Sequence, residues 1–207
     1  MRGLPLFPLP DFFLFPGAVA PLHIFEPRYR QMVSDLLDTS GRLVLAAYHP
    51  DGRVGEAGPA VMPVAGLGEI VHHETLADGR YLIWVLGLGR VRVAEVASNR
   101  LYRKTDAQLL ADEDVDEEAA VTLIPQLQEA ITARAPRGHG LDGELPVGLL
   151  ADILLNALPL DASRTASVFA ELSPVVRAEQ ALAWHDDYPP GDPGTPESPE
   201  GPGTPGT

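Results

Sequence analysis

The sequence lacks cysteine altogether and contains a single lysine, Lys104. The absence of cysteine excludes disulfide bonds, thiolate catalysis, and zinc or iron–sulfur centres with sulfur ligands. Basic residues are scarce as well, because 15 lysines and arginines stand against 29 aspartates and glutamates, and the formal charge is −14. Such a chain has no broad positive field to attract phosphates, so we expect no non-specific binding of nucleic acids.

Long apolar runs are also missing. Residues 1–11 contain three prolines and an aspartate where a signal peptide needs an unbroken apolar helix. No apolar run approaches the roughly 20 residues that span a bilayer. We therefore expect a cytoplasmic protein without a membrane partner.

The first 110 residues are expected to form β structure, because short apolar runs recur between glycine, proline and aspartate. Asp78-Gly79 predicts a tight hairpin, and Gly87-Leu88-Gly89 predicts a further reversal or a bulge. Strands at this spacing indicate a small closed or nearly closed barrel. The expected strands are 4–9, 12–15, 43–48, 62–73, 81–86, 90–96 and 102–109.

One helix interrupts these strands and begins at Pro27, since proline suits the first helical turn. Its apolar residues recur with helical spacing and predict a stripe that lies against the barrel. The stripe consists of Tyr29, Met32, Val33, Leu36 and Leu37.

A helical period replaces the alternating one after residue 110. Helices are expected at about 116–135 and 145–158, separated by a glycine-rich break at 138–140. Asp161 is the expected N-cap of a third helix. Ser173 is the corresponding start of a fourth, which ends near residue 185.

The end of the chain has a different composition. Residues 189–207 are nearly all proline, glycine, threonine, serine and acids, with no apolar side chain to bury. Because such a segment cannot offset the entropy lost on ordering, we expect a disordered tail.

Motifs for nucleotide or acyl chemistry are missing. No phosphate-binding loop of the form G-x-x-x-x-G-K-[ST] occurs, and no serine lies in a G-x-S-x-G turn. The glycine pairs at 66–68 and 87–89 lack the third glycine of a dinucleotide fingerprint. We therefore assign no catalytic residue and expect no enzyme.

Candidate metal ligands are equally unconvincing. Asp112, Asp114 and Asp116 open like a calcium loop, but the sixth and twelfth positions hold neither the glycine nor the glutamate that such a loop needs. His72 and His73 would point to opposite faces of a strand and cannot share an ion without a bulge. We assign no metal ligand and no cofactor.

The aromatic cluster Phe12-Phe13-Leu14-Phe15 has two open interpretations. In an extended segment Phe13 and Phe15 share one face, whereas Phe12 and Leu14 share the other. If both faces are covered, the cluster is core. If one face is open, it is an apolar patch suited to binding unfolded chains.

The opening of the chain resembles the Lon N-terminal domain, the substrate-binding domain found at the front of Lon proteases and also as a stand-alone protein. The shared motif is Leu4-Pro5-Leu6-Phe7-Pro8-Leu9, then Leu14-Phe15-Pro16-Gly17, then Pro21-Leu22-His23-Ile24-Phe25-Glu26-Pro27-Arg28-Tyr29. Similarities at 66–70, 78–92 and 150–160 follow in the same order, so the resemblance runs from about residue 4 to 182. Because this sequence shows neither an ATPase nor a Ser–Lys protease module, it resembles the stand-alone form.

The resemblance implies an α+β fold, with a PUA-like β pseudo-barrel that carries one inserted helix and is followed by a C-terminal helical lobe. The expected boundaries are 1–110 for the barrel, 111–188 for the lobe and 189–207 for the tail. The implied function is substrate recognition in protein quality control, through binding of exposed apolar segments of unfolded or partly folded polypeptides. A protease or a chaperone is the implied further partner.

A groove between barrel and lobe is the expected place for such binding. The candidate contact residues are apolar or amphipathic and lie on loops, strand ends or an open face: Phe12, Phe13, Phe15, Leu76 and Tyr81. Within the family motif, Tyr29 is expected to pack on the barrel. Glu26 or Arg28 is expected to tie the start of the helix to a neighbouring loop.

Two other functions stay open. An RNA-binding module is suggested by analogy with PUA domains, and it would need a basic stripe, although the acidic body argues against it. That stripe would consist of Arg80, Arg90, Arg92, Arg100 and Arg103. A small-molecule hydrolase is less favoured, because only a cluster of distant residues could supply its chemistry.

Overall fold

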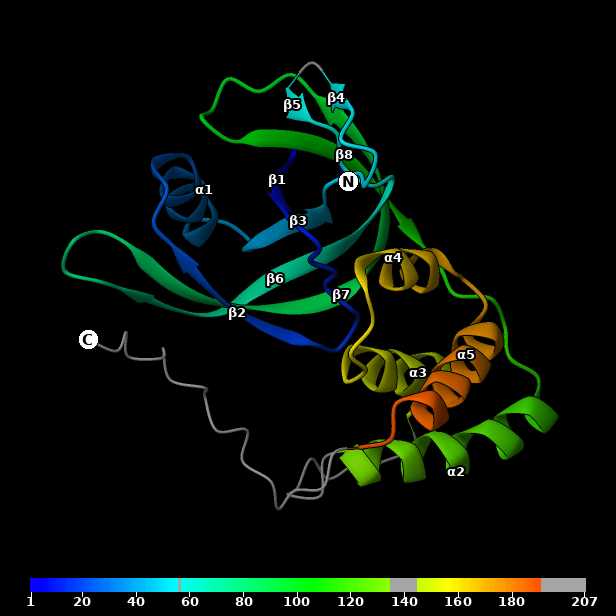
Figure 1. Ribbon diagram of the computed structural model, residues 1–207. Helices are drawn as coiled ribbons and strands as arrows, with labels where there is room; N and C mark the ends of the chain where they lie inside the picture. The colour runs from blue at the N-terminus through cyan, green and yellow to red at the C-terminus, as the bar shows by residue number, and fades with distance from the viewer. Residues whose placement is uncertain (56, 135–144, 191–207) are drawn as a thin grey trace, which may run out of the picture.

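A computed structural model describes residues 1–55, 57–134 and 145–190 of the chain. The strands come first and the helices mostly follow (Figure 1). The strands are β1 (Leu4–Leu9), β2 (Val19–Ile24), β3 (Arg42–Ala47), β4 (Val54–Gly55), β5 (Gly58–Pro59), β6 (Val64–Thr75), β7 (Tyr81–Val96) and β8 (Arg103–Leu110). The helices are α1 (Pro27–Leu37), α2 (Glu117–Arg134), α3 (Val147–Asn156), α4 (Ala162–Ala170) and α5 (Pro174–Asp187).

The strands pair in a closed circuit. β1 lies parallel to β3, and antiparallel pairs β3–β6, β6–β7, β7–β8 and β8–β1 complete the ring. β7 pairs with β6 along one edge. Its other edge is long enough for two partners, so the first half of β7 pairs with β2 and the second half with β8. The predicted α+β fold class with a pseudo-barrel is confirmed by this pairing.

β2 is the longest of three strands that the sequence did not reveal, the other two being the two-residue strands β4 and β5. It forms the edge of the sheet, next to β7 alone, and carries Pro21 in its middle. Proline has no N–H to donate and is tolerated mainly at such edges. The proline-containing run therefore gave no clear strand signal, although it pairs with β7 over all six of its residues.

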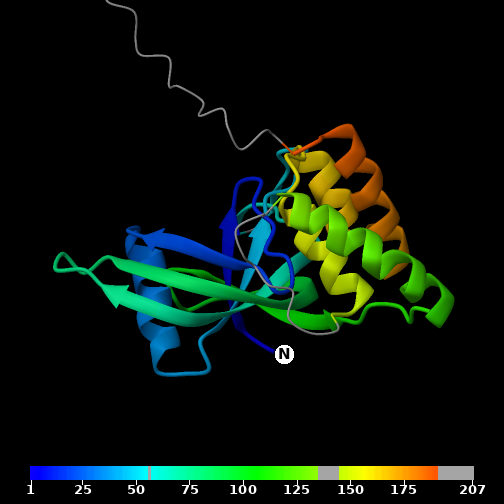
Figure 2. The same ribbon diagram turned by 90° about the horizontal axis from the view of Figure 1, so that it is seen from below.

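The hairpin of β6 and β7 projects from the barrel as an arm, with α1 along it (Figure 1). In Figure 2 the tip of this arm and the four C-terminal helices lie at opposite ends of the molecule. The predicted break at 87–89 is a bulge and not a reversal. Leu67 pairs with Gly89 and Gly68 with Gly87, so Leu88 is the extra residue of the bulge.

Residues 12–15 form no strand, which corrects that expectation, yet their side chains alternate as predicted. Phe12 and Leu14 pack into the barrel core under α1, whereas Phe13 and Phe15 pack against the helical core. Leu14 and Phe15 are therefore core residues on the two sides of the segment, whereas Phe12 and Phe13 are only half-buried. The segment has no ladder of its own because it runs across β6 and β7 as a partition.

Two glycines permit this crossing. A Cβ on Gly66 would lie 2.6 Å from the carbonyl oxygen of Leu14, and a Cβ on Gly87 would lie 2.1 Å from that of Phe15. Both contacts are far closer than any Cβ tolerates, and backbone atoms cannot swing aside. The backbone amide of Gly17 also donates to the carbonyl of Gly87 at 2.9 Å, which ties the segment to β7.

Helices α2 to α5 pack on one another around a second core, which includes Leu127, Leu150, Leu154 and Phe169. Asp161 caps α4 as predicted, because its carboxylate accepts from the backbone amide of Arg164 at 2.9 Å. Ser173 stands at the start of α5, but its hydroxyl makes no capping hydrogen bond. The predicted break at 138–140 lies outside the described residues, as does the predicted tail apart from Pro189 and Pro190.

Across residues 1–55, 57–134 and 145–190, every helix is too short or too polar to cross a bilayer.

Replacing Gly87 by alanine is expected to lower the free energy of unfolding by at least about 2 kcal/mol, because the new methyl group meets the backbone of Phe15. Gly89→Ala is the matched control on the same strand. Its Cβ would meet only the tip of the exposed Leu109 side chain, at 3.3 Å, so we expect a change of about 0.5 kcal/mol or less. Urea unfolding of both variants provides the measurement, and equal losses would contradict the proposed role of the crossing.

Candidate functional site

Barrel and helical lobe are joined by a buried ion pair. Arg90 extends from β7, and its two terminal nitrogens donate to the two carboxylate oxygens of Asp152 on α3, at 2.9 and 2.6 Å. The remaining nitrogen, Nε, donates to the carbonyl of Phe169 at 2.7 Å. Both charged side chains are 2% exposed, so water contributes almost nothing to their solvation.

A second arginine shares the same carboxylate. Arg177 of α5 is fully buried, and its Nε lies 3.2 Å from Asp152 Oδ1. The other end of its guanidinium donates to Asp112 in the linker after β8 and to the carbonyl of Glu171 at 2.9 Å. The network Arg90–Asp152–Arg177–Asp112 thus connects β7, α3, α5 and the linker.

The Asp152 carboxyl has opposing influences on its pKa. Burial raises this pKa above its ordinary value, whereas the hydrogen bonds from Arg90 and the charges of Arg90 and Arg177 act in the opposite direction. The charged form of Asp152 therefore depends on both arginines.

Aromatic rings surround the ion pair on the side of the barrel. Phe169 of α4 packs edge to face on Phe15, with ring centroids 5.1 Å apart, and it also contacts Phe13 at 5.5 Å. The guanidinium carbon of Arg90 lies 5.1 Å from the centroid of Phe169. These contacts exclude water from the junction and hold the two lobes in one arrangement.

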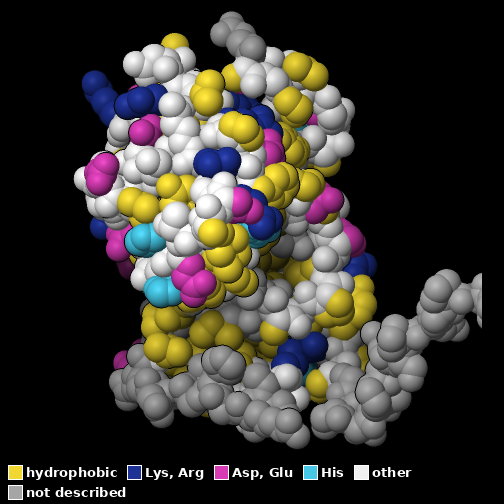
Figure 3. Space-filling view, turned by 90° about the vertical axis from the view of Figure 1, so that its left-hand side faces the viewer, with side chains coloured by type: hydrophobic (Ala, Val, Ile, Leu, Met, Phe, Trp, Pro, Cys, Tyr) yellow, Lys and Arg dark blue, Asp and Glu magenta, His cyan; other side chains and the backbone are white. Residues whose placement is uncertain are grey.

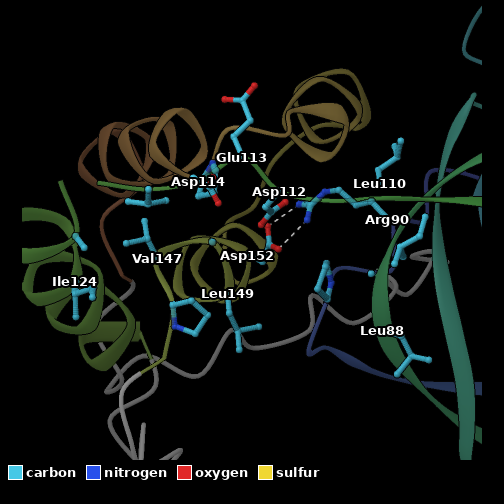
Figure 4. A pocket seen from close by; sticks show the side chains of 18 residues that line it. Leu88, Arg90, Leu110, Asp112, Glu113, Asp114, Ile124, Val147, Leu149 and Asp152 are labelled. Atoms are coloured by element: carbon cyan, nitrogen blue, oxygen red, sulfur yellow. Dashed lines mark hydrogen bonds and ion pairs between the residues drawn. The ribbon is translucent and has the colours of Figure 1, made fainter. Parts of the chain in front are cut away.

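Beside this junction lies an open cleft of about 560 Å³, called here the interlobe cleft. Its apolar walls come from both lobes, with Leu88 and Leu109 on the barrel side and Ile124 and Leu149 on the helical side. Figure 4 shows the Arg90–Asp152 pair between these walls. Leu88 and Leu109 are 39% and 59% exposed, so the cleft presents apolar surface to solvent.

Local structure explains why Leu88 lies in the cleft. As the extra residue of the β7 bulge, it is released from the regular alternation of the strand. On the other side of the cleft, the linker that follows β8 places Asp112, Glu113 and Asp114 along the lining. The interlobe cleft therefore combines apolar walls with an acidic border.

The five candidate contact residues do not come together. Phe15 is 2% exposed and belongs to the helical core, so its ring cannot present a surface to a ligand, and that expectation is wrong. Phe12 and Phe13 are half-buried on opposite sides of the partition. Leu76 and Tyr81 lie at the tip of the arm, away from the cleft lining. A role in binding for these four stays a prediction.

The arm end has a mixed surface. Figure 3, which looks at the molecule from that side, shows hydrophobic side chains interspersed with acidic and histidine side chains. His72 packs against Trp84 with ring centroids 4.8 Å apart. In the described part of the chain, no group of three or more histidines and acids could hold a metal ion.

The motif residues at the start of α1 have structural contacts. Tyr29 is 5% exposed and packs on Phe7 of β1, with ring centroids 4.3 Å apart, as expected. Glu26 and Arg28 pair with each other, since Arg28 Nε donates to Glu26 Oε2 at 2.9 Å. This local pair corrects the expectation of a tie to a neighbouring loop, and it places the guanidinium 4.5 Å from the Tyr29 ring centroid.

The arginines of the suggested basic stripe are mostly neutralised. Arg90 is buried against Asp152, which corrects its assignment to the surface. Three others have exposed or half-exposed acidic partners: Arg80 pairs with Asp78, Arg100 with Asp35 and Arg103 with Glu95. A continuous positive face is therefore not formed by these residues.

Sequence reasoning missed the residues of the junction and of the interlobe cleft. One signal was present, because Asp152 is the only charged residue within the apolar helix Val147–Asn156, and a lone acid there suggests a buried partner. The partners lie far away in sequence, 62 residues for Arg90, so spacing alone could not identify them.

Comparison with known proteins identifies one family. The model of the family described as "ATP-dependent protease La (LON) substrate-binding domain" matches residues 3–185. Two curated relatives are Lon protease 2 of Syntrophobacter fumaroxidans, 27% identical over 170 residues, and Lon protease of Trichlorobacter lovleyi, 25% identical over 183 residues. These alignments cover 80% and 84% of this chain, but only 19% and 22% of the relatives. The chain thus spans about a fifth of their length.

Solved structures agree on the fold. A Lon N-terminal domain protein from Xanthomonas campestris superimposes with a TM-score of 0.64 and 24% identity, covering 89% of this chain and 99% of that one. The N-terminal domain of the Mycobacterium avium complex Lon protease superimposes with a TM-score of 0.67 and 17% identity. This match covers 90% of this chain and 100% of that one. At these identities the likeness concerns the fold alone.

Asp152→Asn is expected to lower the free energy of unfolding by about 3–5 kcal/mol, because it leaves two buried arginines without their shared counter-charge. Asp78→Asn is the control, since it breaks an exposed pair with Arg80 and should leave stability nearly unchanged. Chemical unfolding of both variants tests this. If Asp152→Asn unfolds at the same denaturant concentration as the parent, the network does not hold the lobes together.

Alkaline pH is expected to destabilise the protein between pH 10 and 12. Burial raises the pKa of Tyr29 to about 12 from its ordinary value of 10.0, so the fold favours the neutral phenol. The resulting stabilisation is complete below pH 10 and is lost as pH rises through 12. Tyr29→Phe should therefore flatten the decline of unfolding free energy over this range. A remaining slope is expected from Tyr102, whose pKa burial also raises to about 12, and an unchanged slope in Tyr29→Phe would contradict this assignment.

Proposed function

Because this chain belongs to the family of ATP-dependent protease La (LON) substrate-binding domains, we propose that it is a non-enzymatic module that binds exposed apolar segments of polypeptides in the interlobe cleft. The observation that carries this proposal is the open apolar surface between two lobes that a buried ion-pair network joins. The family description supports the general role, and the cleft supplies a place for it.

The size and lining of the cleft suit apolar side chains. A volume of about 560 Å³ lies within the ordinary range of ligand pockets and can take more than one side chain. Each leucine or phenylalanine that moves from water onto these walls gains about 1.5–3 kcal/mol. Binding of a few such side chains is enough for a weak and reversible complex, which is what recognition of many different segments requires.

The junction network makes the cleft preorganised. Its barrel wall and its helical wall are linked through Arg90, Asp152 and Arg177, all of them buried. A cleft whose walls are already in place loses little conformational entropy when a segment binds. This favours a binding role that needs no folding of the protein itself.

The chemistry of the cleft also favours binding over catalysis. Of its lining residues with charged side chains, Arg90 and Asp152 are engaged with each other in the junction. Among the residues that the structure describes, the cleft lining contains no histidine, serine or lysine, and its two unengaged carboxylates, Glu113 and Asp114, are exposed. A bound segment would thus leave unchanged, for example toward a protease or a chaperone partner.

Leu109→Asp is expected to weaken binding of short peptides rich in leucine and phenylalanine about tenfold or more, because it replaces an apolar wall by a charge. Stability should change little, since Leu109 is 59% exposed. Fluorescence anisotropy with the full chain and a panel of apolar and charged peptides measures this affinity.

Val54→Asp on β4 is the matched control. Val54 is 75% exposed and lies outside the cleft lining, so the same change of chemistry should leave peptide affinity intact. Equal losses in both variants, or no saturable peptide binding by the parent, would contradict the proposal. Salt-sensitive binding of a structured RNA without peptide binding would instead favour the RNA-binding alternative.

A further inference from the structure

The acidic border of the interlobe cleft consists of three consecutive residues with different surroundings. Asp112 is engaged, because both of its carboxylate oxygens accept from Arg177. It also lies against the first turn of α3, where a Cβ on Gly148 would approach its Oδ2 to 2.6 Å. The negative charge of Asp112 is therefore neutralised by Arg177 and contributes little to the attraction of a ligand.

Glu113 and Asp114 differ from Asp112 in this respect. Both are exposed, both line the interlobe cleft, and neither forms an ion pair with any residue that the structure describes. Their position is fixed, since the backbone amide of Glu113 donates to the carbonyl of Leu172 at 3.0 Å. In Figure 4 the side chain of Glu113 extends away from the Arg90–Asp152 pair.

The charges around the cleft consequently do not cancel. Arg90 and Arg177 offset Asp152 and Asp112 within the junction network, whereas Glu113 and Asp114, beside the apolar walls, have no counter-charge among the described residues. The complementary ligand has apolar side chains for the walls and a positive charge for this border. Lysine and arginine fit, because their aliphatic stems can follow the apolar wall while the charged group stays in water.

From this charge complementarity we infer that the interlobe cleft selects polypeptide segments in which apolar side chains are flanked by lysine or arginine, and that Glu113 and Asp114 provide the selection. The inference rests on the proposed function and specifies its substrate class. Segments flanked by aspartate or glutamate are disfavoured by the same two charges.

The test compares peptides with one apolar core and three kinds of flank, namely lysine, glutamine and glutamate. With the parent chain at low salt, the lysine-flanked peptide should bind about three- to tenfold more tightly than the glutamine-flanked one, as expected for two exposed charge pairs. The glutamate-flanked peptide should bind more weakly than both. Added salt should reduce these differences.

Glu113→Gln combined with Asp114→Asn should abolish the preference for lysine flanks, so that the lysine-flanked and glutamine-flanked peptides bind this variant with nearly equal affinity. The matched control is Glu117→Gln with Glu118→Gln, which removes the same charge from the start of α2, outside the cleft lining. This control should keep the preference.

The two proposals fail in different ways. If both double variants change the preference equally, overall charge and not the cleft border causes it, and the inference is overturned. If the glutamine-flanked peptide binds in a manner sensitive to Leu109→Asp but lysine flanks give no gain, the selection fails while the proposed function stands. If no peptide binds, both fail.

Discussion

The arrangement of the two lobes depends on one carboxylate that two arginines share. Asp152 lies on an otherwise apolar helix, and without Arg90 and Arg177 its burial would be costly. Hydrophobic contacts can be made in many relative orientations, whereas the two parallel hydrogen bonds from Arg90 accept only one. The position of each cleft wall therefore follows from this pairing.

The partition at residues 12–15 performs a related task by different means. It separates the two apolar cores and contributes side chains to each, so neither core is complete without the same short segment. The segment can cross β6 and β7 only because Gly66 and Gly87 have no side chain. Charge thus sets the orientation of the lobes, while close backbone packing sets their separation.

Much of this fold could be predicted from the sequence, because α1, α4 and most strands carry local signals such as Pro27, the N-cap Asp161 and apolar alternation. The edge strand β2 and the unpaired state of residues 12–15 could not be predicted, since both are decided by pairing partners distant along the chain. The residues of the interlobe cleft were even harder to predict from the sequence. Leu88, Leu109 and Asp152 have no shared motif, and only the folded chain brings them to one cleft. Aromatic character guided the expectation toward Phe15, which packs edge to face on Phe169 in the helical core.

Pro21 on β2 has a consequence for how such a protein stays separate from its ligands. Unfolded chains present many unsatisfied backbone amides and carbonyls, and an open sheet margin is a template on which they can stack and nucleate aggregates. At the margin formed by β2, the central residue has no amide hydrogen to offer. Proline on an edge strand is one of the features that discourage such pairing, so Pro21 disfavours the addition of a ligand's backbone to β2.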